Sequence, residues 1–112
     1  MRATDFRRLA LALPEAVESE HMQHPDFRVG KKIFATLDAE GRCGVLKLSP
    51  QAQQAALRAH PGVFEPCAGA WGARGYTKVA LEAASVALVR PLLEQAWSSV
   101  APAKLRNAQP GV

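Results

Sequence analysis

Apolar residues recur at helical spacing near both ends of the chain. Near the N-terminus they follow Thr4, a good N-cap, and are Phe6, Leu9, Ala10 and Leu13. Near the C-terminus they follow Ser85 and form one stripe of Val89, Leu92, Leu93, Ala96, Trp97 and Val100. Pro14 ends the first predicted helix, and Pro91 falls within the first two turns of the last one. The pattern therefore predicts an amphipathic helix near each end.

The stretch Asp26–Leu48 has the short apolar runs and turns of consecutive antiparallel strands. Gly30-Lys31 separates the run Phe27–Val29 from the run Lys32–Leu37, and glycine accepts the positive φ of a two-residue hairpin turn. A second turn is predicted at Asp38–Gly41. This stretch is therefore the predicted centre of a sheet.

The second half of the chain reads as a helix followed by two strands. Ser49-Pro50 is a strong helix start, and His60-Pro61-Gly62 ends the helix after Ala59. Val63–Cys67 is a short predicted strand, and Tyr76–Leu81 alternates clearly between apolar and polar residues. The glycine-rich segment between these strands, Ala68–Gly75, is predicted to be a loop.

The predicted element order is α-β-β-β-α-β-β-α. Val17–Met22 alternates weakly and indicates an additional edge strand, despite its poor strand propensity. Short connections favour antiparallel pairing, and the helices must bury their apolar stripes on one sheet face. We therefore expect an α+β two-layer sandwich with helices on one face of an antiparallel sheet. Residues 1–101 form the single predicted domain, and residues 102–112, which lose periodicity, form a predicted flexible tail.

Composition fits a single soluble domain. The chain has 112 residues, of which 48% are hydrophobic and 21% charged. Its N-terminus carries charges where a signal peptide has its apolar core, and its apolar runs fall short of the roughly 18 residues of a spanning helix. We expect a cytoplasmic protein without a membrane partner. Cys43 and Cys67 are not in a C-x-x-C arrangement, so free thiols are predicted.

Charge is unevenly distributed along the chain. The net charge of +4 and the pI of about 9.5 make a polyanionic partner plausible. Residues 14–26 hold four acidic residues and no Lys or Arg, whereas residues 27–48 hold five basic and two acidic residues. An acidic edge beside a basic sheet would orient an anionic partner.

Strand alternation predicts which side chains lie on the sheet face away from the helices. The residues expected to face the helices are Leu46, Leu48, Thr77, Val79 and Leu81. Lys47, Tyr76 and Lys78 then face away, together with Lys32 and Phe34 if their strand is in matching register. Basic side chains release counterions from phosphates, and aromatic rings stack on bases. The face therefore fits nucleic acid, although the same pattern is typical of an ordinary solvated face.

The glycine-rich loop is a second candidate site. Its glycines let the backbone approach a ligand, and Arg74 can contact a phosphate, but the spacing matches neither a P-loop nor a dinucleotide-binding turn. Trp71 is interpreted as a structural plug under the sheet end, with a stacking platform as the alternative.

The sequence offers little for metal binding or catalysis. His21 and His24 have glutamates nearby, but histidines three apart on a strand point to opposite faces. No nucleophile stands beside a base at convincing spacing. We therefore expect no enzyme activity, no catalytic residue, no metal and no cofactor.

Several short motifs point to one family. They are His24–Val29, Gly30–Ala35, Ser49-Pro50, His60–Val63, Trp71-Gly72 with Gly75, the alternating Thr77, Val79 and Leu81, and Ala101-Pro102. With these motifs the sequence, from about Phe6 to Leu105, resembles the MmcQ/YjbR family of small bacterial proteins. The resemblance implies a frataxin-like (CyaY-like) α+β fold with a double-wing DNA-binding motif and no established enzyme activity. It also implies that the hairpin with Arg28 and the loop with Trp71 are wing or edge elements.

The resulting hypothesis is a non-enzymatic DNA-binding protein with weak, mainly electrostatic contacts. The predicted contact residues are Arg28, Lys31, Lys32, Lys47, Trp71, Arg74, Tyr76 and Lys78. The alternative is a protein-interaction or chaperone-like module that uses the open sheet face or an edge strand for a protein partner or a homodimer.

Overall fold

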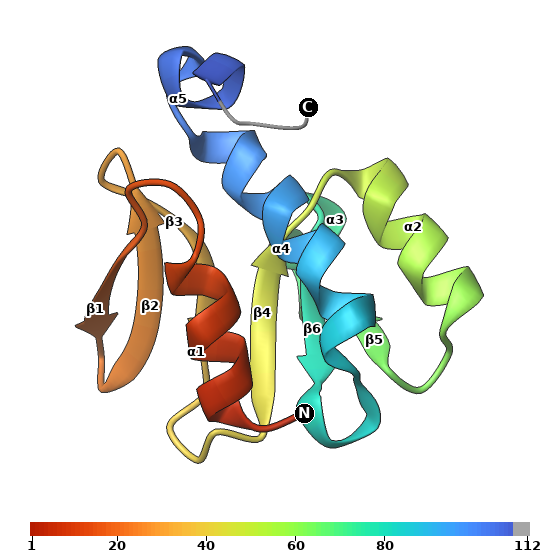
Figure 1. The fold of residues 1–112 in the computed structure, drawn as a ribbon. Coiled ribbons are helices and arrows are strands. Elements are labelled where there is room, and N and C mark those ends of the chain that lie inside the picture. The colour runs from red at the N-terminus through yellow and green to blue at the C-terminus, as the bar shows by residue number, and fades with distance from the viewer. Residues whose placement is uncertain (109–112) are drawn as a thin grey trace.

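The computed structural model describes residues 1–108 and confirms the α+β class (Figure 1). The helices are α1 (Ala3–Leu11), α2 (Pro50–Ala59), α3 (Ala70–Ala73), the 3-10 helix η1 (Leu81–Ala83), α4 (Val86–Val100) and α5 (Ala103–Ala108). The strands are β1 (Val17–His21), β2 (His24–Val29), β3 (Lys32–Leu37), β4 (Cys43–Lys47), β5 (Phe64–Pro66) and β6 (Tyr76–Ala80). All six strands form one antiparallel sheet in the order β1-β2-β3-β4-β6-β5.

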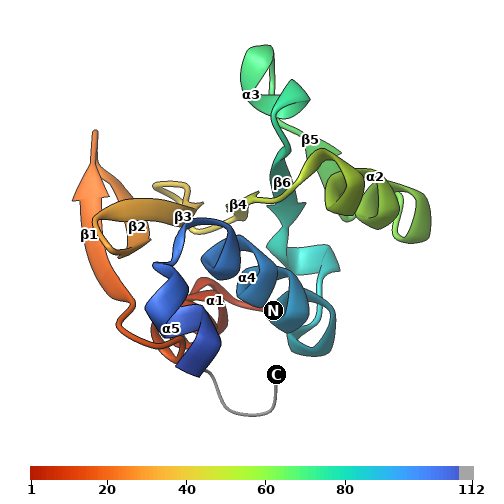
Figure 2. The same ribbon diagram turned by 90° about the horizontal axis from the view of Figure 1, so that it is seen from above.

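Helices α1 and α4 pack on the same face of this sheet, as Figure 2 shows. The predicted stripe explains the packing of α4, because Val89, Leu93 and Ala96 are buried. Trp97 is also buried, and its Nε1 donates a hydrogen bond to the Pro14 carbonyl oxygen at 3.0 Å. This bond joins the last long helix to the segment that follows the first one.

The strand residues predicted to face the helices are all buried. They are Leu46, Leu48, Thr77, Val79 and Leu81. The predicted caps Ser49 and Ser85 are confirmed, since their hydroxyls accept hydrogen bonds from the backbone N–H groups of Ala52 and Leu88. The cap predicted at Thr4 is wrong, because α1 begins at Ala3.

A β-bulge corrects the predicted register of β3. Phe27 pairs with Ala35 but Arg28 pairs with Ile33, so Phe34 is an extra residue on β3. The bulge lets two successive residues face the core, and Phe34 is fully buried there. Lys32 pairs with Val29, a core residue, and is exposed only because it lies at the hairpin end. The prediction that Phe34 and Lys32 share the face with Lys47 is therefore wrong.

Four elements differ from the predicted order. The indicated edge strand is present as β1, so four strands precede α2. The glycine-rich loop contains α3, η1 precedes α4, and α5 occupies part of the predicted tail. Residues 109–112 of that tail lie outside the described residues. Within residues 1–108, no helix is long and apolar enough to cross a membrane.

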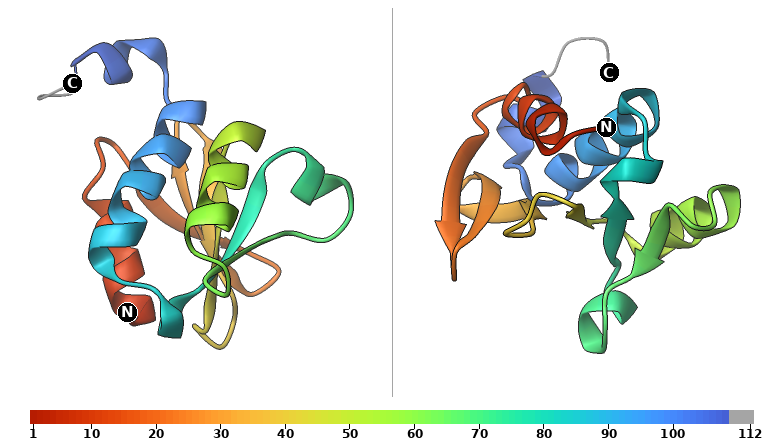
Figure 3. Two further views of the ribbon diagram at one scale, coloured as in Figure 1. Left: turned by 90° about the vertical axis from the view of Figure 1, so that its right-hand side faces the viewer. Right: turned by 90° about the horizontal axis from the view of Figure 1, so that it is seen from below.

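The sheet face opposite α1 and α4 is bordered by the loop that carries α3 and, at the other edge, by β1 and β2. Figure 3 shows the loop that carries α3 projecting to this side, away from α1 and α4, and Figure 2 shows β1 and β2 curving toward it at the other edge. We call this the open face. By strand register its side chains include Asp26, Arg28, Thr36, Val45, Lys47, Tyr76 and Lys78.

Candidate nucleic-acid interface

Strand register brings basic residues from distant parts of the sequence to one end of the sheet. Lys47 ends β4 and pairs with Tyr76, the first residue of β6. The turn between β2 and β3 lies at this same end, because β3 and β4 are antiparallel with Ala35 opposite Leu46. We call this the basic end. It comprises Lys31, Lys32, Lys47 and Arg74.

The β2–β3 turn is the tight reversal that the sequence predicts. Gly30 and Lys31 both have positive φ, 57° and 69°, as a type I′ hairpin turn requires. A Cβ on Gly30 would lie 3.2 Å from the Pro102 ring, so the turn packs beside the start of α5. The turn therefore holds Lys31 and Lys32 at a fixed place on the molecule.

Trp71 is exposed, which corrects its interpretation as a buried plug. Its relative exposure is 57%, and it lies on the short helix α3 just before β6. The Arg74 guanidinium carbon lies 5.6 Å from the centre of the Trp71 ring. The Tyr76 ring meets the same tryptophan edge-on, at a centroid distance of 5.0 Å. Trp71, Arg74 and Tyr76 thus form one aromatic and cationic cluster.

The glycines of this segment serve close backbone packing. A Cβ on Gly72 would lie 2.0 Å from the Cys67 carbonyl oxygen, and a Cβ on Gly75 would lie 2.0 Å from that of Leu48. The buried Gln53 side chain donates hydrogen bonds to the carbonyl oxygens of Gly72 and Tyr76, both at 3.1 Å. The close approach predicted for a ligand is therefore made by the chain itself. Because Gly72 occupies the buried side of α3, Trp71 is left outside.

Arg28 lies on the open face in a network with a buried carboxylate. The Asp26 side chain is fully buried and accepts hydrogen bonds from Arg28 Nε at 2.8 Å and Nη2 at 3.0 Å. His21 Nδ1 lies 2.7 Å from Asp26 Oδ2 and donates to it, since an ionised carboxylate only accepts. The Arg28 hydrogen bonds outweigh the effect of burial and lower the pKa of Asp26. Arg28 thus neutralises Asp26, which the sequence interpretation did not foresee.

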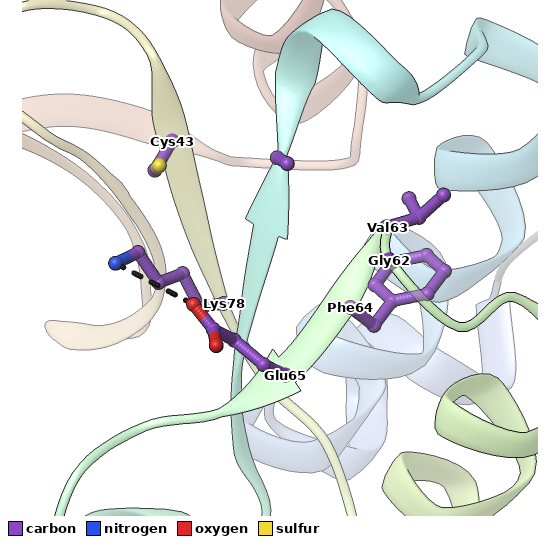
Figure 4. A pocket seen from close by; sticks show the side chains of 7 residues that line it. Cys43, Gly62, Val63, Phe64, Glu65 and Lys78 are labelled. Carbon is purple, nitrogen blue, oxygen red and sulfur yellow. Dashed lines mark ion pairs between the residues drawn. The ribbon is translucent and has the colours of Figure 1, made fainter.

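Lys78 is also balanced by an acid on the open face. Its Nζ lies 3.7 Å from Glu65 Oε1 (Figure 4). Both side chains are well exposed. Register explains the pair, because Glu65 is the cross-strand neighbour of Lys78 on β5. Screening by water makes such a pair weak, so the Lys78 ammonium can be released for another anion.

The eight predicted residues therefore divide into two groups. Six gather toward one end of the sheet, namely Lys31, Lys32, Lys47, Trp71, Arg74 and Tyr76. Arg28 and Lys78 lie on the open face in ion pairs. Among the described residues, none of the four cations of the basic end takes part in an ion pair.

The sequence interpretation missed two further cations. Lys104 and Arg106 lie on α5, directly after the proline that packs against the β2–β3 turn. Arg106 Nη1 also donates to the Ser98 carbonyl oxygen at 3.2 Å, which ties α5 to α4. No periodicity predicts this helix, so only the contact at Pro102 places these residues near the basic end.

The two histidines meet in a shallow hollow toward the other end of the open face. Their ring centres are 6.3 Å apart, because His21 and His24 are register partners on β1 and β2. The hollow is also lined by Thr36, Leu37, Asp38, Cys43, Val45 and Lys78. In residues 1–108, no group of three or more His, Cys, Asp or Glu side chains is placed to hold a metal ion.

Both cysteines are free thiols, and burial raises the pKa of Cys67.

This arrangement defines a class of small α+β domain in which helices cover one face of an antiparallel sheet and leave the other open. The YjbR family model matches residues 11–99, and the chain belongs to this family. A crystal structure of Deinococcus radiodurans protein DR2400, with a DUF419 domain, has a similar fold. Its TM-score is 0.77 at 20% sequence identity, over 93% of this chain and 84% of that chain. Comparison with curated proteins gives no match. The predicted family is thus confirmed.

Proposed function

We propose that this protein is a non-enzymatic, cytoplasmic nucleic-acid-binding protein that contacts phosphates through the basic end. The observation that carries the proposal is that Lys31, Lys32, Lys47 and Arg74, which come from three segments of the sequence, all lie at one end of the sheet. The turn between β3 and β4, which holds Asp38 and Glu40, lies at the opposite end of the sheet. Because that turn also holds Arg42, its charges largely offset one another, and a polyanion would be attracted mainly to the basic end. The β2–β3 hairpin and the loop that carries α3 would be the wing elements that the family resemblance implies.

The expected binding is weak and depends strongly on salt. Phosphate contacts alone give dissociation constants of about 10⁻⁴ to 10⁻⁶ M, and each neutralised phosphate contributes about 0.9 to the log–log salt slope. If the four cations of the basic end each contact one phosphate, affinity falls roughly 100-fold between about 50 and 200 mM salt. If Lys78 leaves Glu65 and contacts a further phosphate, the salt dependence becomes steeper. Arg28 should not contribute in this way, because buried Asp26 holds it.

Two charge reversals at opposite ends of the sheet test the proposal. Lys32 and Arg42 are both exposed, and each replacement by Glu changes the net charge equally. We expect Lys32→Glu to weaken binding of a labelled oligonucleotide about tenfold at ~50 mM salt, and Arg42→Glu to leave it nearly unchanged. Fluorescence anisotropy titrations measure both. Equal losses in the two variants would mean that net charge, and not the basic end, governs binding.

The alternative function, binding of a protein partner, is supported only by an accessible strand edge. β1 is one of the two edge strands and every one of its residues is exposed, so its outer edge is accessible for strand pairing. However, Glu18 and Glu20 lie on that strand, and two copies paired through it would bring like charges together. Size-exclusion chromatography at ~1 M salt, where screening extends only about 3 Å, separates this alternative from electrostatic binding.

A further inference from the structure

We infer, resting on the proposed function, that the preferred ligand is single-stranded nucleic acid and that Trp71 is a stacking platform for an unpaired base. Four large apolar side chains are notably exposed in the described chain, namely Leu11, Val17, Met22 and Trp71. Trp71 is the aromatic one, and it stands beside the basic end. Its position therefore combines a large ring with cations, the two features that single-strand binding surfaces share.

The backbone that carries Trp71 is held in place although the ring is exposed. Gly72, the next residue, packs so tightly on Cys67 that no side chain fits between them. Gln53 fixes the backbone on both sides of Gly75 through its bonds to the Gly72 and Tyr76 carbonyl oxygens. Arg74 and Tyr76 already contact the ring, so it loses less conformational entropy than a ring on a mobile loop when a base stacks on it. This local rigidity suits a binding platform better than a mobile loop would.

Phosphate-binding groups lie near the ring. Arg74 contacts Trp71 directly, and Lys47 is the cross-strand neighbour of Tyr76, which meets Trp71 edge-on. A strand whose base stacks on Trp71 would therefore have its adjoining phosphates near Arg74 and Lys47. In a duplex the bases are already stacked and paired, so their faces are not accessible to a side chain without unstacking. The chemistry of the cluster thus favours an unpaired strand over a duplex.

The test compares one labelled strand of about 12 nucleotides with its duplex, at ~50 mM salt. We expect the single strand to bind about tenfold more tightly, as stacking of one base allows. Trp71→Ala should remove most of this preference by weakening single-strand binding far more than duplex binding, and Trp71→Phe should retain much of it. Met22→Ala is the matched control, because Met22 is 86% exposed and lies in the turn at the opposite end of β2.

Intrinsic fluorescence gives a second readout without a substitution. Trp97 is fully buried, so quenching on addition of the single strand reports on Trp71. Equal affinity for strand and duplex, or equal losses of both with Trp71→Ala, would overturn the stacking inference and leave the proposed function standing. Absence of binding to either form would contradict both.

Discussion

At the scale of single residues, the Asp26 carboxylate is the charge most dependent on its partners. It is fully buried, and Arg28 and His21 supply its hydrogen bonds. We predict that Asp26→Asn lowers the free energy of unfolding by about 1–3 kcal/mol at pH 7, because the charge-assisted bonds are lost. The contribution should be fully present above the unfolded pKa of Asp26 and be lost as pH falls through the lower folded value.

Urea unfolding of both proteins at several pH values measures this effect. The difference in stability should hold from neutral pH down to about pH 4 and then shrink. Asp38→Asn is a useful control, since Asp38 accepts its hydrogen bond from a backbone N–H group in an exposed turn. A difference between wild type and Asp26→Asn that is the same at pH 7 and at the acid limit would contradict the account.

Gly72 gives a second residue-scale prediction. An alanine Cβ there would meet the Cys67 carbonyl oxygen at 2.0 Å, so the backbone must move. We expect Gly72→Ala to destabilise the protein by about 1–3 kcal/mol, as other overpacked sites do, and to change the fluorescence of Trp71. Ala70→Ser, at an exposed position of the same helix, should change neither. Unchanged thermal unfolding of Gly72→Ala would contradict the packing described here.

At the scale of elements, the sequence predicted those that have a regular pattern. The stripe of α4 and the Gly30-Lys31 turn were predictable because helical period and turn chemistry are local properties. The bulge at Phe34 was not predictable, because the sequence alone does not show where a strand carries an extra residue that shifts its pairing with the neighbouring strand. Helix α3 is only four residues long, and its glycines read as a loop.

Helix α4 carries a proline at a position that can be improved. Pro91 is the sixth residue of α4 and is exposed, so it lacks the N–H that would bond to the Ala87 carbonyl oxygen. We predict that Pro91→Ala raises the free energy of unfolding by about 1–3 kcal/mol, because little packing is lost and a helix bond is gained. Thermal or urea unfolding measures the change. A lower stability would mean that Pro91 makes an essential bend.

At the scale of the whole molecule, the candidate site depends on information that the sequence does not carry. The sequence indicated that the hairpin and β4 are basic, but only register shows that Lys47 and Tyr76 are neighbours. It could not show that Arg28 is engaged by Asp26, because an i, i+2 pair on a strand has many possible rotamers. Exposure of Trp71 was likewise undetermined, since either a buried or an exposed tryptophan fits a glycine-rich segment.

The central claim is that the basic end binds phosphates, and the salt dependence of binding tests it most directly. The measurement is the log–log slope of affinity against salt for wild type and for Lys31→Ala/Lys32→Ala, with one labelled oligonucleotide. The account predicts a wild-type slope of about −3 to −4 and a slope about 1.5 to 2 units shallower in the double variant, since each lysine neutralises one phosphate. A slope that the double variant leaves unchanged, or no wild-type binding at ~50 mM salt, would contradict it.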